Sequence, residues 1–437
     1  MDREKLYYVL YEQQEDFKEK KNLIPRELTA DVLSLFHLKM PIIITGVRRS
    51  GKSTLLKILS EELHMREKSI LYINFNDERL ISFSEEDFQK ILDFLVEQKY
   101  APQSCLSIDE IQEVEKWEKW VDRIKGKHPI VITGSNSKLL SKEISTILTG
   151  RSMSVVLFPF SFKEFLCARK IETEKFTIDI NVQSQIRKEL VSYLNEGGLP
   201  SRVVYGDKRI CEELYENIIY RDIIKRFNPN LEKAIKEVSL FLLSNTSKKV
   251  SLRNLSKTVG VANLSTMKAI FGAFENAFLF FSVQKYDSSV KKQLQNPKKI
   301  YCIDNGFIAA KSFQLSPDYG KLYENIVAIS LKRKELEGKL QFYYWKDQQS
   351  HEEVDFVVKK GLKVTELIQV CYNHNNPKTK EREARALLRA SKELKCSNLL
   401  IITQDKESEE TFSWFGTTRK IRFVPLWKWL LGEKEKK

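Results

Sequence analysis

The sequence contains little cysteine and histidine, and neither is arranged for metal binding. Six cysteines and five histidines are spread over 437 residues, and no two cysteines form a C-x-x-C pair. A structural zinc site needs four such ligands at short, characteristic spacings. The sequence therefore argues against a zinc site, and we expect six reduced thiols that are mostly packed inside the protein.

Long hydrophobic runs are also absent. The longest apolar runs, Met40–Thr45 and Phe278–Val283, are much shorter than the ~20 residues that cross a bilayer. The N-terminus is charged and has no apolar signal core. We therefore expect a cytoplasmic protein with no membrane contact. Its length, with 42% hydrophobic and 30% charged residues, predicts a globular chain of two or three domains.

Acidic residues are scarce in one part of the chain, although the net charge of the whole is +14. Residues 1–170 hold 27 Lys/Arg and 26 Asp/Glu, whereas residues 171–437 hold 46 and 33. Residues 241–300, called the basic segment below, hold 10 basic and 2 acidic residues. A neutral part joined to a basic part is typical of a protein that meets a polyanion. A surface rich in lysine without such a purpose is the alternative.

The most informative pattern that is present lies between residues 41 and 54. An apolar strand runs into G-x-x-x-x-G-K-S and then into a helix. The glycines let successive backbone N–H groups point at phosphate oxygens, Lys52 supplies a charge for the β- and γ-phosphates, and the Ser53 hydroxyl can ligate Mg²⁺. We therefore predict ATP and Mg²⁺ as cofactors. The predicted nucleotide-binding residues are Gly46, Val47, Arg48, Arg49, Ser50, Gly51, Lys52, Ser53 and Thr54.

A second motif follows at residues 105–112, where an apolar strand ends in two acids. Asp109 is expected to hold Mg²⁺, and Glu110 is expected to polarise the attacking water. Such an acidic pair is a weak signal alone and a strong one downstream of a phosphate-binding loop. The two motifs together predict ATP hydrolysis.

Three further residues are candidates for sensing the γ-phosphate. The next apolar strand, residues 129–134, is followed by Ser135 and Asn136, either of which can act as a sensor or cap a helix. Arg151 follows at a place where an arginine can reach a phosphate across a domain or subunit boundary, and a surface arginine is the alternative reading.

Strands at 69–75 and 105–109 with a helical pattern at 85–99 predict a parallel sheet.

These motifs resemble the AAA-type ATP-binding protein family of archaea and bacteria, and the resemblance covers nearly the whole chain. It implies that Arg151 senses phosphate, that Ile24–Arg26 packs near the adenine, and that a C-terminal domain of largely unknown role follows the ATPase. The motifs that carry the resemblance are residues 46–54, 108–112, 132–137, 148–151 and 159–165.

The predicted fold is α/β in three parts. A P-loop AAA-type ATPase domain with a parallel sheet and an N-terminal extension is expected at 1–170. A helical lid and winged-helix domain is expected at 171–305. A restriction-endonuclease-like α/β domain of the PD-(D/E)xK type is expected at 306–437.

The basic segment has the element order of a winged helix-turn-helix: helix 250–259, turn 260–263, helix 264–277, then two strands around a lysine-rich loop. The second helix would read DNA, with Ser265 and Thr266 near its start, and the loop would lie against phosphates. Such modules also serve as protein-binding or lid elements. The predicted DNA-binding residues are Lys268, Lys291, Lys292, Lys298 and Lys299.

The C-terminal part matches the PD-(D/E)xK metal site incompletely. Glu324 on a helix and Asp355 in a strand fit, because acids at these places hold Mg²⁺ for phosphodiester cleavage. Gln369 and Cys371 occupy the positions of the remaining acid and the lysine, and neither has the required charge. We therefore predict a nuclease-like fold that has lost cleavage. Lys363 on the same strand keeps an active alternative open.

The sequence thus predicts an ATPase that hydrolyses ATP with Mg²⁺ and couples hydrolysis to binding or remodelling DNA. Two alternatives remain: a nucleotide-gated switch that recruits a protein partner without nucleic acid, and an ATP-coupled nuclease. An oligomer would follow if Arg151 acts in trans, and the sequence leaves cis and trans action open.

Overall fold

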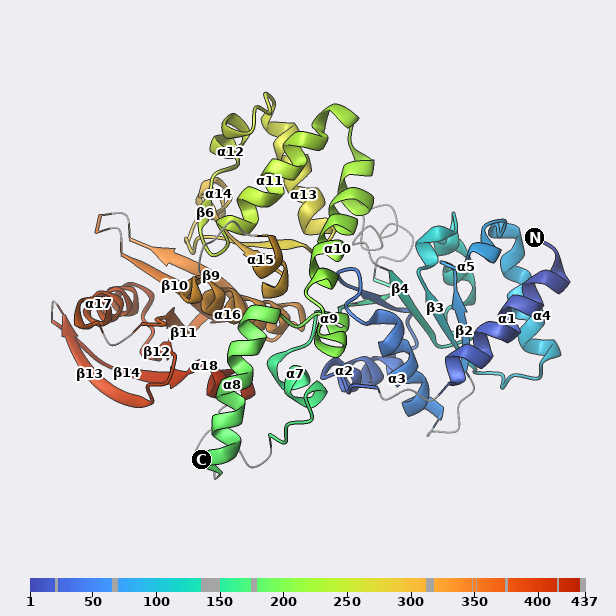
Figure 1. Cartoon of the computed structure of the whole chain (residues 1–437), viewed down its shortest axis with the longest axis horizontal. Helices are drawn as coiled ribbons and strands as arrows, with labels where there is room; N and C mark the ends of the chain where they lie inside the picture. The colour runs from blue at the N-terminus through green and yellow to red at the C-terminus, as the bar shows by residue number, and fades with distance from the viewer. Residues whose placement is uncertain are drawn as a thin grey trace. The chain divides into compact units, whose positions relative to one another are not determined.

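The computed structural model describes residues 1–19, 23–64, 70–134, 150–173, 179–311, 318–347, 349–350, 352–373, 376–414 and 416–432. The chain separates into two compact units, each of which is described by itself (Figure 1). Unit 1 comprises residues 1–158 and 276–278, and unit 2 comprises residues 159–275 and 279–437. The α/β fold class is confirmed, with a parallel sheet first, a helical region next and a second sheet last.

The described part of unit 1 is built on a five-stranded sheet whose paired strands are all parallel, in the order β2-β3-β4-β1-β5. Because the strands are parallel, their carboxyl ends meet at one edge, where ligands bind in such sheets. The phosphate-binding loop follows β1 and the acidic pair follows β3, with β4 between them. The strands are β1 (Ile42–Thr45), β2 (Ile70–Asn74), β3 (Cys105–Asp109), β4 (Ile130–Gly134) and β5 (Met153–Val156).

Helices cover both faces of this sheet. This agrees with β1, whose successive apolar side chains point to opposite faces and are all buried. Ile43 packs into a buried cluster with residues of α1, α4 and α5, whereas Ile42 and Ile44 face a second cluster with α2 and α3. Alternate side chains of a strand point to opposite faces, so an apolar run such as β1 fits a sheet buried on both sides. The helices are α1 (Arg3–Lys18), α2 (Leu28–Leu35), α3 (Lys52–His64), α4 (Phe88–Glu97) and α5 (Trp117–Ile124).

The open edge of β2 is covered by two glutamines of α1. The Gln14 side chain donates to the Tyr72 carbonyl at 2.7 Å and accepts from the Tyr72 N–H at 2.9 Å. Gln13 does the same for Asn74, at 3.1 and 3.0 Å. Unpaired backbone groups at a sheet edge invite pairing with another chain. The N-terminal extension therefore completes the sheet of unit 1.

Unit 2 begins with a helical region and continues into the basic segment. Within the described residues, β6, β8 and β7 form an antiparallel sheet in that order beside α12 and α13. The prediction that the lysine-rich stretch is a loop is wrong in part, because residues 290–295 form the short helix α14. The elements are α7 (Phe162–Ala168), α8 (Ile180–Glu196), α9 (Pro200–Tyr205), α10 (Arg209–Asn217), α11 (Glu232–Ser244), β6 (Lys249–Val250), α12 (Leu252–Thr258), α13 (Leu264–Asn276), β7 (Phe280–Val283), α14 (Val290–Gln295) and β8 (Lys298–Cys302).

The rest of unit 2 holds a mixed sheet in the order β13-β14-β12-β11-β10-β9, six strands among the described residues. β9, β10 and β11 are antiparallel, whereas β11, β12 and β14 are parallel. Helix α17 packs its apolar side on the sheet. The elements are α15 (Asn305–Lys311), α16 (Tyr319–Leu336), β9 (Gln341–Lys346), β10 (Glu353–Lys360), β11 (Lys363–Val370), α17 (Pro377–Leu394), β12 (Leu399–Thr403), β13 (Ser408–Trp414), β14 (Thr417–Pro425) and α18 (Leu426–Leu431).

Two of the sequence expectations concern the whole chain. All six cysteines are free thiols, and every one except Cys167 is buried, which confirms that most are packed. In the part of the chain that the structure describes, no helix is long and apolar enough to cross a membrane.

Candidate nucleotide-binding site, basic segment and carboxylate cluster

The loop between β1 and α3 has the backbone that a phosphate cradle needs. Gly46, Arg49 and Gly51 have φ values of +151°, +61° and +96°. Positive φ values turn the chain sharply, so that several N–H groups can face one point. A side chain at Gly46 would be excluded by space as well, because its Cβ would lie 2.2 Å from the Leu157 carbonyl oxygen.

Lys52 begins α3 and is almost fully buried. Its ammonium donates to the carbonyls of Gly46 and Val47, both at 3.2 Å, so it lies against the loop that it is expected to serve. Ser50 is buried too, and its Oγ has no hydrogen-bond partner among the described residues. A cation and a hydroxyl held beside this loop fit the phosphates of a nucleotide.

Arg26 supports the loop from behind. Its guanidinium is buried and donates to the Ser50 carbonyl at 2.9 Å and to the Phe158 carbonyl at 2.6 Å. Because a peptide's C=O and N–H point in opposite directions, fixing the Ser50 carbonyl also fixes the direction of the Gly51 N–H. The structure thus gives Arg26 a loop-supporting contact, which the sequence motifs did not indicate.

Asp109 ends β3 inside a network of hydroxyl groups. Tyr72 of β2 donates to Asp109 Oδ2 at 3.0 Å, and Thr133 of β4 donates to Oδ1. Burial raises the pKa of Asp109. Hydrogen bonds from Ser53, Thr133 and Tyr72 act in the opposite direction and favour the carboxylate. The Ser53 contact brings together the two side chains predicted to hold Mg²⁺.

Glu110 follows in a left-handed conformation, with φ of +52°. Its backbone N–H donates to Thr133 Oγ1 at 3.3 Å, and its carboxylate accepts from the Gln112 side chain. Thr133 therefore touches both acids of the pair and fixes the turn between them. Thr133 and Tyr72 were not identified from the sequence. The pairing of β3 with β2 and β4 was the signal that could have found them.

Of the candidates for sensing the γ-phosphate, the structure describes Arg151. Asn136 and Ser135 lie outside the described residues. Arg151 is 60% exposed and pairs with Asp122 of α5, with 3.5 Å between its Nη1 and Asp122 Oδ1. Its role as a phosphate sensor stays a prediction.

The residues present fit Mg²⁺ and ATP together. The Gly46 cradle has no room for a side chain, Lys52 and the Ser50 hydroxyl are buried beside it, and Ser53 contacts Asp109. Lys52 and the loop N–H groups would hold the phosphates, and Ser53 with Asp109 would hold the metal.

The lysines predicted to bind DNA differ in their exposure to solvent. Lys268 on α13 and Lys291 and Lys292 on α14 are exposed, whereas Lys298 in β8 is half-buried. Lys299 is buried, and its ammonium is surrounded by carboxylates. Its predicted place in an exposed wing is therefore wrong.

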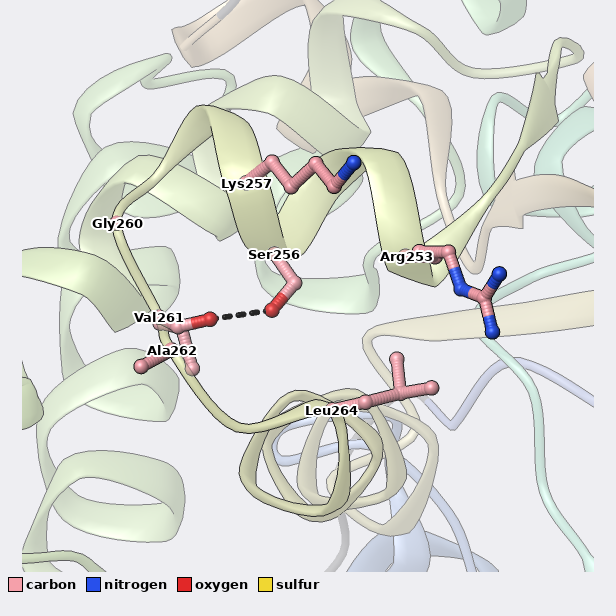
Figure 2. Close-up of a pocket in the computed structure, with 7 residues that line it drawn as sticks. All are labelled: Arg253, Ser256, Lys257, Gly260, Val261, Ala262 and Leu264. Atoms are coloured by element: carbon pink, nitrogen blue, oxygen red, sulfur yellow. Dashed lines mark hydrogen bonds between the residues drawn. The ribbon is translucent and has the colours of Figure 1, made fainter.

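A hollow of about 480 Å³ lies between α12 and the start of α13. Figure 2 shows Arg253 and Lys257 on α12, both exposed, and the turn at 260–262 that lines one side of the hollow. The Ser256 hydroxyl donates to the Val261 carbonyl and fixes this turn. The Ser265 hydroxyl, expected near the start of the helix that reads DNA, donates to the Asn263 side chain at 2.8 Å, and its contact with DNA stays a prediction. The basic segment thus offers cations on α12, α13 and α14.

The structure brings Glu324 of α16 and Asp355 of β10 to one place, as predicted for the nuclease-like site. Both contact the Lys299 ammonium, at 2.9 and 2.8 Å. A third acid, Glu353 of β10, contacts the same ammonium at 2.9 Å and was missed by sequence reasoning. Glu324, Glu353 and Asp355 are called the carboxylate cluster below. Residues 353 and 355 are spaced to share a strand face, which was the available signal.

The two other positions of the nuclease-like motif lie beside this cluster without adding charge. The Gln369 side chain accepts from the Asp355 N–H at 3.1 Å and donates to Glu383 at 2.6 Å. Burial raises the pKa of the Cys371 thiol to about 11, so it is neutral at physiological pH. Lys363 lies at the exposed start of β11.

Models of three protein families match successive parts of the chain. Residues 38–166 match the AAA domain family. Residues 187–317 and 319–427 match two domains of unknown function, DUF8612 and DUF4143. The resemblance is confirmed for the ATPase domain and for a following region of unknown role.

Relatives extend over most of the chain. An uncharacterised protein of Methanocaldococcus jannaschii is 34% identical over 405 residues, which cover 89% of this chain and 88% of the relative. An uncharacterised protein of Haemophilus influenzae is 32% identical over 351 residues, covering 76% and 82%.

Solved structures are only loosely similar. AMPPCP-bound DnaA from Aquifex aeolicus is 15% identical, with 57% of this chain and 86% of that chain covered and a TM-score of 0.30. A STAND protein with a tetratricopeptide repeat sensor from Pyrococcus horikoshii is 13% identical, with 72% and 46% covered and a TM-score of 0.29. Likenesses of this size carry no functional argument. The sequence relatives decide the identity: the chain belongs to one family with these archaeal and bacterial proteins, and its N-terminal part is an AAA-type ATPase domain.

Proposed function

We propose that this protein hydrolyses ATP with Mg²⁺ in unit 1 and couples hydrolysis to the binding or remodelling of DNA by unit 2. The observation that carries the first part is the set of contacts at the carboxyl edge of the sheet. Lys52 lies against the phosphate loop, Asp109 contacts Ser53, and Glu110 follows Asp109 directly. Positioned charges of this kind are what phosphoryl transfer requires.

DNA as the partner is supported by the basic segment. It combines two short helices with a sheet in the order β6-β8-β7, which suits a winged helix-turn-helix. Lys268 on α13 and Lys291 and Lys292 on α14 are exposed residues. Phosphate contacts from such groups supply most non-specific affinity.

A protein partner is favoured by one observation on the same helix. Val290 and Leu294 of α14 are 68% and 65% exposed, and their i, i+4 spacing puts them on one side of the helix. Exposed apolar side chains next to each other suit a protein surface better than a phosphate backbone. A nucleotide-gated interaction switch is therefore the second candidate.

For the C-terminal part we propose a nuclease-like fold that does not cut. Glu324 and Asp355 occupy the places of metal-binding acids, which supports the fold. Gln369 and Cys371 carry no charge for catalysis, which supports the loss of cleavage.

Charge reversal separates the DNA and protein candidates. The triple variant Lys268→Glu/Lys291→Glu/Lys292→Glu should bind a fluorescent DNA duplex at least about 10-fold more weakly, with a shallower dependence on salt. Fluorescence anisotropy across a salt series measures both quantities. Three exposed lysines outside the basic segment provide a control of equal charge, namely Lys188→Glu/Lys360→Glu/Lys392→Glu.

The control should keep most of the affinity. Equal loss in both triple variants would mean that binding follows net charge alone. Unchanged binding in the first variant would remove these lysines from the interface and favour the protein-partner candidate.

A further inference from the structure

The Lys299 ammonium lies within 3 Å of all three acids of the carboxylate cluster. It lies 2.9 Å from Glu324 Oε1, 2.9 Å from Glu353 Oε1 and 2.8 Å from Asp355 Oδ1. A lysine ammonium has three N–H donors, and three carboxylates surround this one. Lys299 donates hydrogen bonds to Glu324 and Asp355 and forms an ion pair with Glu353, so its charge is directed at these acids.

The carboxylates are also held by other groups. Tyr301 donates to Glu324 at 2.7 Å, Lys249 pairs with Glu353, and the Val370 N–H donates to Asp355 Oδ2 at 3.0 Å. Each acid therefore has at least one partner besides Lys299. This network is expensive to rearrange, because breaking any of its hydrogen bonds leaves a buried polar group unpaired.

The centre of this cluster is occupied by the Lys299 nitrogen, which lies 2.8–2.9 Å from one oxygen of each acid. A Mg²⁺ ion needs oxygens at 2.0–2.1 Å, so it could bind these acids only in place of the ammonium. Among the described residues, no group of three or more His, Cys, Asp or Glu side chains is placed to hold a metal ion. Burial opposes the charge of Lys299, but the neighbouring carboxylates outweigh it and raise its pKa well above the usual value.

The cation comes from a different part of unit 2 than the acids. Lys299 lies in β8 of the small sheet, whereas Glu324 lies on α16 and Asp355 in β10. The ion cluster therefore joins the basic segment to the C-terminal sheet. A surface ion pair would contribute little to such a junction, but a buried cluster becomes strongly destabilising when one partner is removed.

We propose that Lys299 is the resident cation of the C-terminal carboxylate cluster, where it takes the place of a divalent metal, blocks nuclease chemistry and fastens the basic segment to the C-terminal sheet. The inference rests on the non-cutting, nuclease-like fold proposed above for the C-terminal part, and it does not depend on ATP hydrolysis in unit 1. It assigns to one residue both the proposed loss of cleavage and the connection between two parts of the chain.

A double-mutant cycle on the full chain tests this proposal. Lys299→Met removes the charge and keeps the length of the side chain, so the buried Asp355 and the half-buried Glu324 and Glu353 lose their cation. The melting temperature of unit 2 should fall by roughly 5–15 °C. Adding Asp355→Asn should recover part of this loss, because one of the uncompensated charges is then gone. Thermal unfolding of the wild type, both single variants and the double variant, each without nucleotide, gives the coupling.

The outcomes are separable. The proposal would be overturned if the decreases in melting temperature of the two single variants simply added in the double variant. It would also be overturned if Lys299→Met were as stable as the wild type. If Lys299→Met does not fold, recovery of folding by Asp355→Asn supports the proposal, and failure to recover contradicts it. A second assay incubates plasmid DNA with Mg²⁺ or Mn²⁺. We expect no cleavage by the wild type above that by Asp355→Asn, and cleavage that depends on Asp355 would show that a metal displaces Lys299.

Discussion

Replacing Glu110 by glutamine should lower the kcat of ATP hydrolysis by about 10²–10⁴-fold and leave ATP binding almost unchanged. Glutamine keeps the shape of the side chain and its contact with Gln112, but it cannot accept a proton from the attacking water. Lys52 and the loop backbone, which hold the phosphates, are untouched. Phosphate release measures kcat, and titration with a fluorescent ATP analogue measures binding.

The control for this variant lies three residues further along. Glu113 is exposed and follows the same strand, so Glu113→Gln removes an equal charge from the same segment. It should keep normal turnover. Undiminished turnover in Glu110→Gln would show that Glu110 has no catalytic role. Weakened ATP binding in that variant would show that Glu110 contributes to binding of ATP in the ground state.

Replacing Gly46 by alanine should weaken ATP binding by at least about 100-fold, which corresponds to ~2.7 kcal/mol. The added Cβ would lie 2.2 Å from the Leu157 carbonyl oxygen and 3.2 Å from Ser50 Oγ. The φ of +151° is also strained for any residue with a side chain. The loop must therefore move, and its N–H groups with it. Nucleotide titration measures the loss, and thermal unfolding of unit 1 reports the strain.

Gly272 provides the comparison for Gly46. It lies within α13, and a Cβ there would meet nothing within 4 Å. Gly272→Ala should leave ATP binding unchanged and stabilise unit 2 slightly, because alanine is a better helix former by ~1 kcal/mol. ATP binding by Gly46→Ala within about 3-fold of the wild type would show that the loop does not form the phosphate cradle described above.

The parts of the molecule that sequence predicted well depend on short stretches of chain. The strand before Gly46, the helix after it and the acidic pair after β3 each occupy a few consecutive residues. Their chemistry is visible locally, because backbone turns and apolar runs have local causes. The elements of the basic segment were also recognisable in order, although α14 was taken for a loop. A six-residue helix has too few periodic positions to stand out.

The parts that sequence missed depend on residues far apart in the chain. Thr133 and Tyr72 reach Asp109 only because β3 pairs with both neighbours. Lys299 looked like a wing residue, because a run of lysines gives no sign that one of them is buried. Its carboxylate partners lie 25 to 56 residues away, and no local pattern encodes that meeting. Glu353 shares a strand face with Asp355, which was a local signal, but that spacing alone does not show that both acids meet Lys299.

The central claim is that ATP hydrolysis in unit 1 is coupled to DNA held by unit 2. Its most direct test is the rate of phosphate release at ~50 mM salt, where phosphate contacts are strong, with Mg²⁺ and with increasing amounts of duplex, branched or single-stranded DNA. We predict Mg²⁺-dependent turnover that at least one of these DNAs raises several-fold, and a requirement for more DNA in Lys268→Glu/Lys291→Glu/Lys292→Glu. Turnover that none of the DNAs changes, in wild type and variant alike, would contradict the coupling.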